Sequence, residues 1–145
     1  MTSSRFISRF IGLALLISLP LSSYAENVTK FGDYVVHHTA LPTDVLLPKV
    51  AKAYGIQRSK NRGMLNIVVQ HKGKATKAKV TGTGTNLNSQ LKHLAFREIK
   101  DGDVIYYISS FRVTNKEVIN FKINIQPSGS SKEQTVKFKK EFYTN

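Results

Sequence analysis

The segment from Arg58 to Gly63 holds the side chains best suited to bind an anion. Arg58, Lys60 and Arg62 place three cations within five positions, and Asn61 adds an amide close to the turn-forming Gly63. Backbone N–H groups of a turn and cationic side chains can gather around a phosphate or a carboxylate, and a guanidinium group supplies two parallel donors. This spacing predicts an anion- or partner-binding loop.

Two other interpretations of this loop remain open. The same composition is typical of a solvated hairpin turn, in which Asn61 and Gly63 are selected for their backbone angles. In a third interpretation the arginines are structural and pair with Glu98 or Asp33. A site near the loop would also include Arg97. The candidate binding residues are therefore Arg58, Lys60, Asn61, Arg62 and Arg97.

The histidines do not have the spacing of a metal site. His37 and His38 are adjacent on a predicted strand, so their side chains point to opposite faces and cannot easily chelate one ion. His71 and His93 are distant in sequence, and there is no cysteine or carboxylate cluster to join them. Asp101–Asp103 lacks the rest of a calcium loop and is expected to form a hairpin turn. We predict no metal site.

The sequence lacks the parts that most catalytic sites need. It has no cysteine and no G-x-S-x-G motif, and its nine acidic residues are scattered mainly in turns. Gly82 and Gly84 form a lone G-x-G without the lysine of a phosphate-binding loop. These glycines instead predict a bulge or a strand face that another backbone approaches closely. We expect no enzyme and no cofactor, and the alternative is a small hydrolase or small-molecule-binding enzyme near the Arg58–Arg62 loop.

Alternation of apolar and polar residues indicates the elements that must position these side chains. Apolar residues occupy every second position from Ile119 to Ile125, and the same period recurs in 65–69 and 136–142. This period places one strand face in a core and the other in water. Turn residues interrupt the runs about every ten positions. The predicted strands are 33–39, 56–58 with 63–71, 76–86, 94–99, 103–113, 117–126 and 133–143.

These runs predict an all-β fold, namely an immunoglobulin-like antiparallel β-sandwich of about seven strands with one short helix. A small closed barrel is the alternative. The helix is expected near 44–54, where apolar residues fall roughly on one helical face. Thr43 or Asp44 could cap its start, Pro48 fits only its first turn, and Gly55 could end it.

The first 25 residues have the order of parts of a cleavable secretory signal peptide. Arg5 and Arg9 give a positive start, Phe10–Leu19 is apolar, and Ser23 and Ala25 are small residues at the cleavage positions. The apolar run is about half the roughly 20 residues of a spanning helix, so no transmembrane segment is expected after cleavage.

The predicted domains are a signal peptide (1–25) and a single β-sandwich domain (26–145), which we expect in the periplasm. The mature part keeps 20 basic and 9 acidic residues, a net charge of +11. Export makes nucleic acid an unexpected partner, whereas anionic lipids, glycans and acidic envelope proteins remain. The alternative is that dispersed lysines serve solubility and protect strand edges.

Several motifs resemble one known family. They are Phe31–Tyr34, Val50–Ile56, Arg58–Gly63, Val80–Leu87, Phe96–Ile99 and Ile105–Ile108. Together they are similar to a family of small exported Gram-negative proteins, domain of unknown function 4426 (DUF4426). The resemblance covers essentially the whole mature chain. It implies a periplasmic immunoglobulin-like domain and assigns no activity or functional residue.

The sequence therefore favours a periplasmic accessory domain without enzymatic activity. We expect its basic surface to bind an unidentified envelope protein, or an anionic glycan or lipid.

Overall fold

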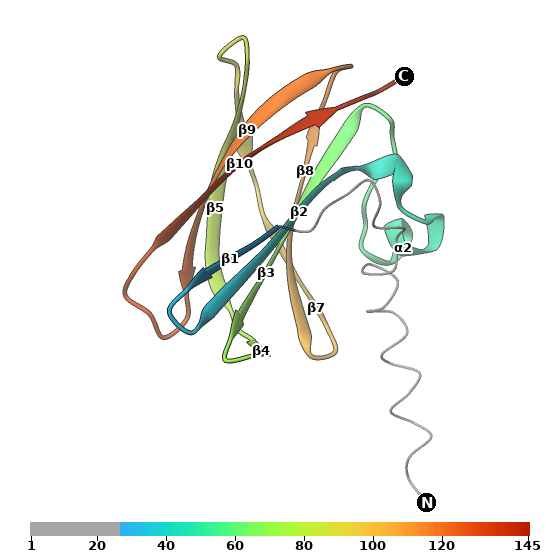
Figure 1. Ribbon diagram of the computed structural model, residues 1–145. Coiled ribbons are helices and arrows are strands. Elements are labelled where there is room, and N and C mark those ends of the chain that lie inside the picture. The colour runs from blue at the N-terminus through green and yellow to red at the C-terminus, as the bar shows by residue number, and fades with distance from the viewer. Residues whose placement is uncertain (1–26) are drawn as a thin grey trace, which may run out of the picture.

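The structure is a computed structural model that describes residues 27–145 (Figure 1). Two short helical segments, η1 (Thr43–Val45, a 3-10 turn) and α2 (Pro48–Ala53), interrupt an otherwise β chain. The strands are β1 (Asn27–Phe31), β2 (Tyr34–Pro42), β3 (Arg62–His71), β4 (Lys74–Ala75), β5 (Ala78–Asn86), β6 (Leu91–Leu94), β7 (Arg97–Asp101), β8 (Val104–Arg112), β9 (Glu117–Pro127) and β10 (Gln134–Phe142).

These strands form two antiparallel sheets. The first sheet has the order β1-β2-β3-β8-β7, with β4 paired to β3, and the second has the order β10-β9-β5-β6. Figure 1 shows η1 and α2 beside the first sheet, on the side away from β5, β9 and β10. The predicted all-β sandwich with one short α-helix is confirmed, and the closed barrel is wrong because no strand pair joins the two sheets among the described residues.

The core lies between the sheets and follows the alternation in the sequence. Every second residue of β9 from Ile119 to Ile125 is almost completely buried, as are Leu65, Ile67 and Val69 of β3. Phe142 at the end of β10 packs edge-on against Phe111 of β8, with 5.7 Å between ring centroids. It therefore joins the two sheets at the end of the sandwich where β3 begins.

Two predicted strands differ from the structure. Residues 56–58 are not a strand, because Ile56 N–H donates to Ala51 O at 2.8 Å and closes the helical segment, the name used here for residues 43–53 with η1 and α2. The predicted strand 94–99 is two strands in different sheets: Leu94 pairs with Gly82 in the second, and Arg97 pairs with Ile108 in the first. Two strands that the sequence did not predict, β1 and β4, extend the first sheet.

The helical segment was predicted in the right place with the wrong start. Pro48 does occupy the first turn of α2, and Gly55, with φ of +64°, follows its end. The residue before the helix is Leu47, and no side chain caps it. Thr43 lies in η1, and its hydroxyl instead donates to Ser59 O at 3.1 Å and accepts from Ser59 N–H at 2.9 Å. The segment is thus tied to the loop that precedes β3.

The two glycines of β5 lie where the sequence predicts close backbone approach. A Cβ on Gly82 would lie 2.9 Å from Lys122 O and 2.6 Å from Ile123 Cδ1. A Cβ on Gly84 would lie 2.8 Å from Ile119 Cγ2. The predicted close approach of another backbone is therefore confirmed at Gly82, whereas the space at Gly84 is limited by side chains of β9.

The predicted signal peptide, residues 1–25, lies outside the described residues. Within residues 27–145 no helix is long and apolar enough to cross a membrane.

Candidate functional site

Arg58 is bound to backbone carbonyls of the helical segment. Its Nε–H donates to Leu46 O at 2.7 Å, and its Nη2–H donates to Asp44 O at 3.0 Å. These carbonyls lie in and just after η1, so the guanidinium fixes this segment to the loop before β3. The structural interpretation is therefore correct for Arg58, although its partners are carbonyl oxygens and not a carboxylate.

Arg97 has a similar structural role at the other end of the helical segment. Its Nη2–H donates to Tyr54 O at 2.6 Å, just beyond the last turn of α2. A Cβ on Gly55 would lie 3.3 Å from Arg97 Nη1, so the guanidinium lies against the glycine. Cations near a helix C-terminus also interact favourably with the unpaired carbonyls there.

The Glu98 carboxylate, one of the two suggested partners of the arginines, interacts with other side chains. Glu98 Oε2 accepts a hydrogen bond from the Tyr107 hydroxyl at 3.1 Å, and Glu98 Oε1 lies 3.7 Å from Lys77 Nζ. Among the described residues no ion pair joins Glu98 or Asp33 to an arginine. The predicted Arg–Glu98 and Arg–Asp33 pairs are wrong.

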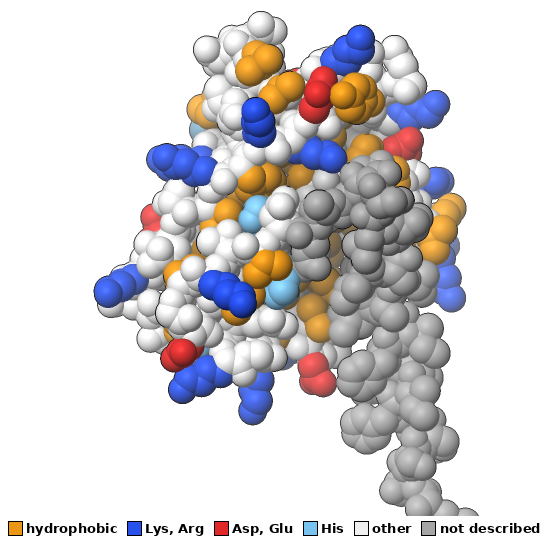
Figure 2. Space-filling view, viewed as in Figure 1, with side chains coloured by type: hydrophobic (Ala, Val, Ile, Leu, Met, Phe, Trp, Pro, Cys, Tyr) orange, Lys and Arg blue, Asp and Glu red, His pale blue; other side chains and the backbone are white. Residues whose placement is uncertain are grey.

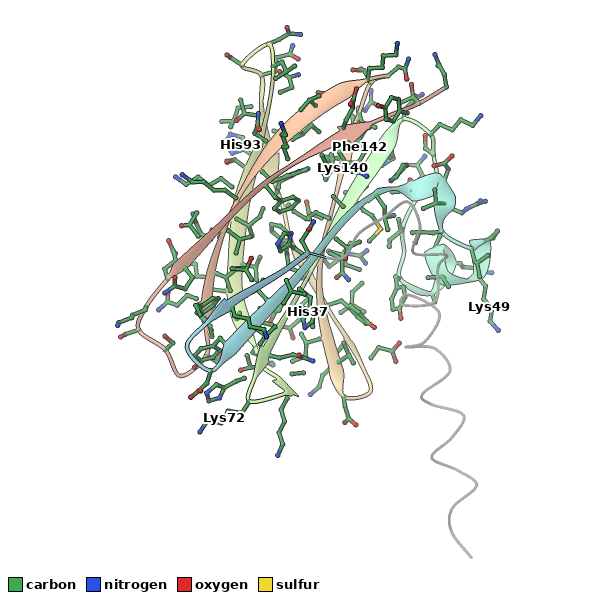
Figure 3. All side chains as sticks on the ribbon, in the orientation of Figure 1. His37, Lys49, Lys72, His93, Lys140 and Phe142 are labelled. Carbon is green, nitrogen blue, oxygen red and sulfur yellow. The ribbon has the colours of Figure 1, made fainter. Side chains whose placement is uncertain are left out.

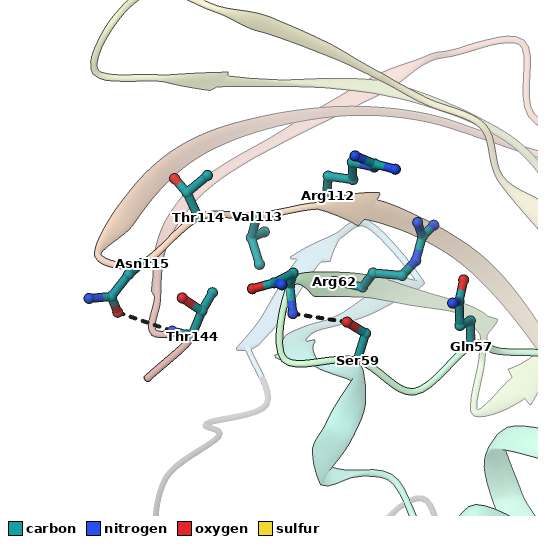
Figure 4. Close-up of a pocket in the computed structure, with 9 residues that line it drawn as sticks. Gln57, Ser59, Arg62, Arg112, Val113, Thr114, Asn115 and Thr144 are labelled. Carbon is teal, nitrogen blue, oxygen red and sulfur yellow. Dashed lines mark hydrogen bonds between the residues drawn. The ribbon is translucent and has the colours of Figure 1, made fainter.

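Arg62 lies at the edge of a pocket that also contains Arg112. Arg62 begins β3 and Arg112 ends β8, and the two residues are directly opposite in the antiparallel register. Directly opposite residues project from the same sheet face with Cβ atoms roughly 5 Å apart. Figure 4 shows both side chains in this pocket, which has a volume of about 600 Å³. Its lining residues are Gln57, Ser59, Asn61, Arg62, Arg112, Val113, Thr114, Asn115 and Thr144.

The pocket is electropositive because no acid compensates its two arginines. None of the nine lining residues is Asp or Glu. The Arg62 side chain donates from Nε–H to an uncharged acceptor, Ser110 Oγ, at 3.2 Å. Like charges directly opposite each other on neighbouring strands are destabilising. An anion bound between the two guanidinium groups would offset this repulsion.

The acid at this end of β9 is not available to the arginines. Glu117 is only 9% exposed, and Lys92 Nζ lies 3.2 Å from its Oε2. Its Oε2 also accepts from Asn86 Nδ2 at 2.9 Å, and its Oε1 accepts from Thr114 N–H at 2.9 Å. Burial would raise the pKa of the Glu117 carboxyl, but the bonds from Asn86, Thr114 and Lys92 outweigh burial and lower it.

Backbone hydrogen bonds hold the pocket wall in place. Val113 N–H donates to Asn61 O at 2.9 Å and joins the loop before β3 to the end of β8. Asn61 N–H donates to Ser59 Oγ at 3.1 Å, and Thr144 N–H donates to Asn115 Oδ1 at 3.1 Å, as the dashed lines in Figure 4 show. The polar groups are thus positioned before any ligand arrives, which reduces the entropy cost of binding.

Of the predicted site residues, the structure brings together Asn61 and Arg62 in the pocket. Lys60 is exposed and does not line it, and Arg58 and Arg97 support the helical segment. Sequence reasoning missed Arg112 and the amides and hydroxyls of Asn115 and Thr144. Nothing local in the sequence marks them, because the pairing of β3 with β8 brings them to Arg62.

The pocket chemistry suits binding. Two guanidinium groups, amides and hydroxyls can donate hydrogen bonds to an oxyanion. The nine lining residues include no histidine, lysine, cysteine or carboxylate that could act as a general base or metal ligand.

The histidines occupy separate places in the fold. His37 Nε2 lies 3.2 Å from Gln70 Oε1 on the outer side of β2, and His38 packs in the core against Phe138 with 4.3 Å between ring centroids. His71 stacks on Tyr34 at 4.4 Å, while His93 is exposed on β6. Figure 3 labels His37 and His93, which lie well apart. Within residues 27–145 no three His, Asp or Glu side chains gather in a metal-binding group.

One tyrosine under the helical segment has an unsatisfied hydroxyl. Tyr106 is buried between β8 and the helical segment, and no partner for its hydroxyl exists among the described residues. Tyr54, beside it, donates from its hydroxyl to Asp101 Oδ2 at 2.8 Å. Burial, and then the charge of Asp101, raise the pKa of Tyr106 to about 12. Tyr106 therefore stays neutral and packs among the apolar side chains between β8 and the helical segment.

Comparisons with known proteins agree on the family and the fold. The model of a family described as a domain of unknown function, DUF4426, matches residues 28–145. A DUF4426 family protein from Pseudomonas aeruginosa is 35% identical, with a TM-score of 0.74 over 83% of this chain and 96% of that one. None of the curated proteins compared matches the chain.

More distant structures share the fold alone. FetP of uropathogenic Escherichia coli, expressed recombinantly in the periplasm, is 12% identical with a TM-score of 0.60, over 83% of this chain and 95% of FetP. A copper-bound variant of FetP gives the same identity and TM-score over 82% and 95%. The metal in that variant is a property of FetP.

Proposed function

The chain belongs to the DUF4426 family, whose function is unknown, and from this premise we propose that it is a non-enzymatic domain that binds an anionic group between Arg62 and Arg112. The observation that carries the proposal is the direct opposition of two arginines in a pocket whose nine lining residues include no acid. A folded protein without a ligand would be more stable with a neutral residue at one of these positions. The pair of directly opposed charges therefore points to a bound anion.

The chemistry of the pocket defines the class of ligand. A carboxylate or phosphate could accept bidentate hydrogen bonds from each guanidinium, while the amides of Gln57, Asn61 and Asn115 bind neighbouring polar groups. The ligand is thus an anionic group carried by an envelope protein, a glycan or a lipid headgroup. The predicted signal peptide and the net charge of +11 support a periplasmic site of action, where such partners are present.

The first test measures small-anion binding to the purified protein. Inorganic phosphate and an oligoglutamate peptide are titrated while the Arg Nε–H signals are followed by NMR at low salt. We expect shifts at Arg62 and Arg112, and at least about tenfold weaker binding in Arg62→Gln or Arg112→Gln, because each removes charged hydrogen bonds. Lys49→Gln on α2 makes the same change of charge outside the pocket and should bind as the wild type does.

The second test identifies the partner in cells. A photo-reactive residue at the exposed Asn61 position is cross-linked in living cells, and the products are analysed by mass spectrometry. One reproducible product that disappears in Arg112→Gln, with the fold intact by circular dichroism, supports the proposal. If neither anion binds, or if Lys49→Gln weakens binding as much as Arg112→Gln does, the pocket is not the binding site.

A further inference from the structure

The outer face of the second sheet is basic, and the pocket function does not involve it. In β9 and β10 the residues that alternate with the core project outward, and they include Lys122, Lys137 and Lys139, all of which are exposed. Lys122 lies directly opposite Lys137, so like charges face each other across the strands. The one acid that projects from these strands on this face, within the described residues, is Glu141 near the end of β10.

The lysines surround a shallow hollow on this face. Its volume is about 460 Å³, and its lining includes all three lysines together with Phe121 and Phe138. The register places Thr83 of β5, Lys122 of β9 and Lys137 of β10 in one row across the sheet. Neighbouring strands are roughly 5 Å apart, so the cationic groups form a compact patch about 10 Å across.

Two exposed leucines lie on the hairpin that joins β5 to β6 in the same sheet. Leu87 is 74% exposed and Leu91 is 54% exposed. Leu91 pairs with Thr85, Thr85 pairs with Asn120, and Asn120 pairs with Lys139. These four residues form the next row across the sheet. Figure 1 shows this hairpin projecting beyond the other strands, and Figure 2 shows hydrophobic side chains on it.

Side-chain hydrogen bonds around Asn86 fix the shape of this hairpin. Asn86 Oδ1 accepts hydrogen bonds from Asn88 N–H at 3.1 Å and Gln90 N–H at 3.0 Å. Asn86 Nδ2 donates to Gln90 Oε1 at 2.7 Å and to the buried Glu117 carboxylate at 2.9 Å. The turn is therefore fixed by Asn86, Gln90 and the neighbouring Glu117 of β9, and Leu87 is exposed within this fixed turn.

From this combination we infer that the second sheet docks on an anionic phospholipid bilayer. The leucines of the projecting hairpin insert at the boundary between headgroups and acyl chains, and Lys122, Lys137 and Lys139 lie over the phosphates. Apolar insertion beside basic residues is the usual means by which a peripheral protein holds an anionic membrane. A soluble polyanion would use the lysines but would gain nothing from Leu87 and Leu91, so the observations favour the bilayer. The inference goes beyond the proposed anion pocket and does not depend on it.

The test is sedimentation of the exported, signal-free protein with vesicles of phosphatidylethanolamine and phosphatidylglycerol, compared with phosphatidylcholine vesicles. We expect binding to the anionic vesicles alone. Lys122→Gln with Lys137→Gln should weaken binding roughly 30-fold, since each lysine near an anionic surface contributes about fivefold. Leu87→Ser should weaken binding about tenfold by removing apolar insertion.

Matched controls separate this surface from overall charge and from the pocket. Lys49→Gln with Lys72→Gln removes the same charge from α2 and from the turn after β3, both away from the projecting hairpin (Figure 3), and should bind within twofold of wild type. Arg112→Gln should keep vesicle binding while losing the small anion, whereas loss of both would assign the bilayer contact to the pocket and overturn the inference.

Three further results would overturn the inference. They are equal losses in the two lysine pairs, vesicle binding that is unchanged in Leu87→Ser, or binding of dextran sulfate without binding of vesicles. The last result would assign the lysines to a glycan. Circular dichroism of each variant confirms that the fold is intact.

Discussion

Gly63 begins the buried part of β3 beneath two aromatic rings, and alanine at this position should destabilise the protein. A Cβ there would lie 2.7 Å from Phe111 Cε2 and 2.9 Å from Phe142 Cε1. Alanine would ordinarily gain about 0.4–1 kcal/mol by restricting the unfolded chain. Overpacking in a core costs about 1–3 kcal/mol, so we expect a net loss of about 1–2 kcal/mol.

The structural cause can be isolated by a double-mutant cycle with Phe142. Phe142 is 1% exposed, and Phe142→Ala alone should cost about 3–5 kcal/mol. Removal of the Phe142 ring eliminates one of the two close contacts of an alanine Cβ at position 63. It also leaves space into which the Phe111 ring can move. The combined loss should therefore be smaller than the sum of the single losses by about 1 kcal/mol or more.

The assay is urea unfolding at 25 °C followed by circular dichroism, since the chain has no tryptophan. Gly82→Ala with Phe142→Ala is the control cycle, because a Cβ on Gly82 would meet Ile123 and Lys122 O and not Phe142. That pair should be additive within about 0.5 kcal/mol. Additive losses for Gly63 and Phe142 would show that ring crowding is not the reason for this glycine.

Three further predictions concern stability. Arg112→Gln should raise the free energy of unfolding by about 0.2–1 kcal/mol at low salt by removing like-charge opposition, and the gain should shrink as salt is added; a loss of stability would contradict the pocket electrostatics. Glu117→Gln should lower stability by about 1–3 kcal/mol at neutral pH. Because the folded-state pKa of Glu117 lies below 4.5, its stabilisation is present above about pH 4.5 and is lost as the pH falls through the folded value. Unfolding measured from pH 7 to pH 3 should therefore show the two proteins converging in acid, and a constant difference would contradict the assigned pKa direction. Tyr106→Phe should leave thermal stability unchanged or raise it by about 1 kcal/mol, because it deletes a buried hydroxyl without a partner; a loss above 1 kcal/mol would reveal a missing hydrogen bond.

The sequence predicted strands well where one face meets the core. β3, β8, β9 and β10 alternate clearly, and their predicted ranges agree with the structure within a residue or two. Alternation does not reveal which sheet a strand joins, so the run from Leu94 to Ile99 was interpreted as one strand although the chain changes sheets within it. β1 has few apolar residues and pairs at an edge, where local pattern carries little information.

Local sequence pattern likewise predicted only part of the candidate site. Local composition pointed to Asn61 and Arg62, which both line the pocket, because a cationic turn is visible in a few adjacent residues. It grouped Arg58 and Arg97 with them, although these guanidinium groups bind carbonyls of the helical segment. Arg112 could be found only from the register between two strands that are distant in the sequence.

The order of strands in each sheet also bears on how the chain reaches its native state. Leu65 pairs with Ser109 and Thr81 pairs with Asn124, so partners in the middle of both sheets lie more than 40 residues apart. Entropy must be lost to close such long loops before these contacts form, and proteins of this kind fold over milliseconds to seconds. We therefore expect the two central strand pairings to limit the rate of folding, and packing alone must stabilise the result because the sequence contains no cysteine.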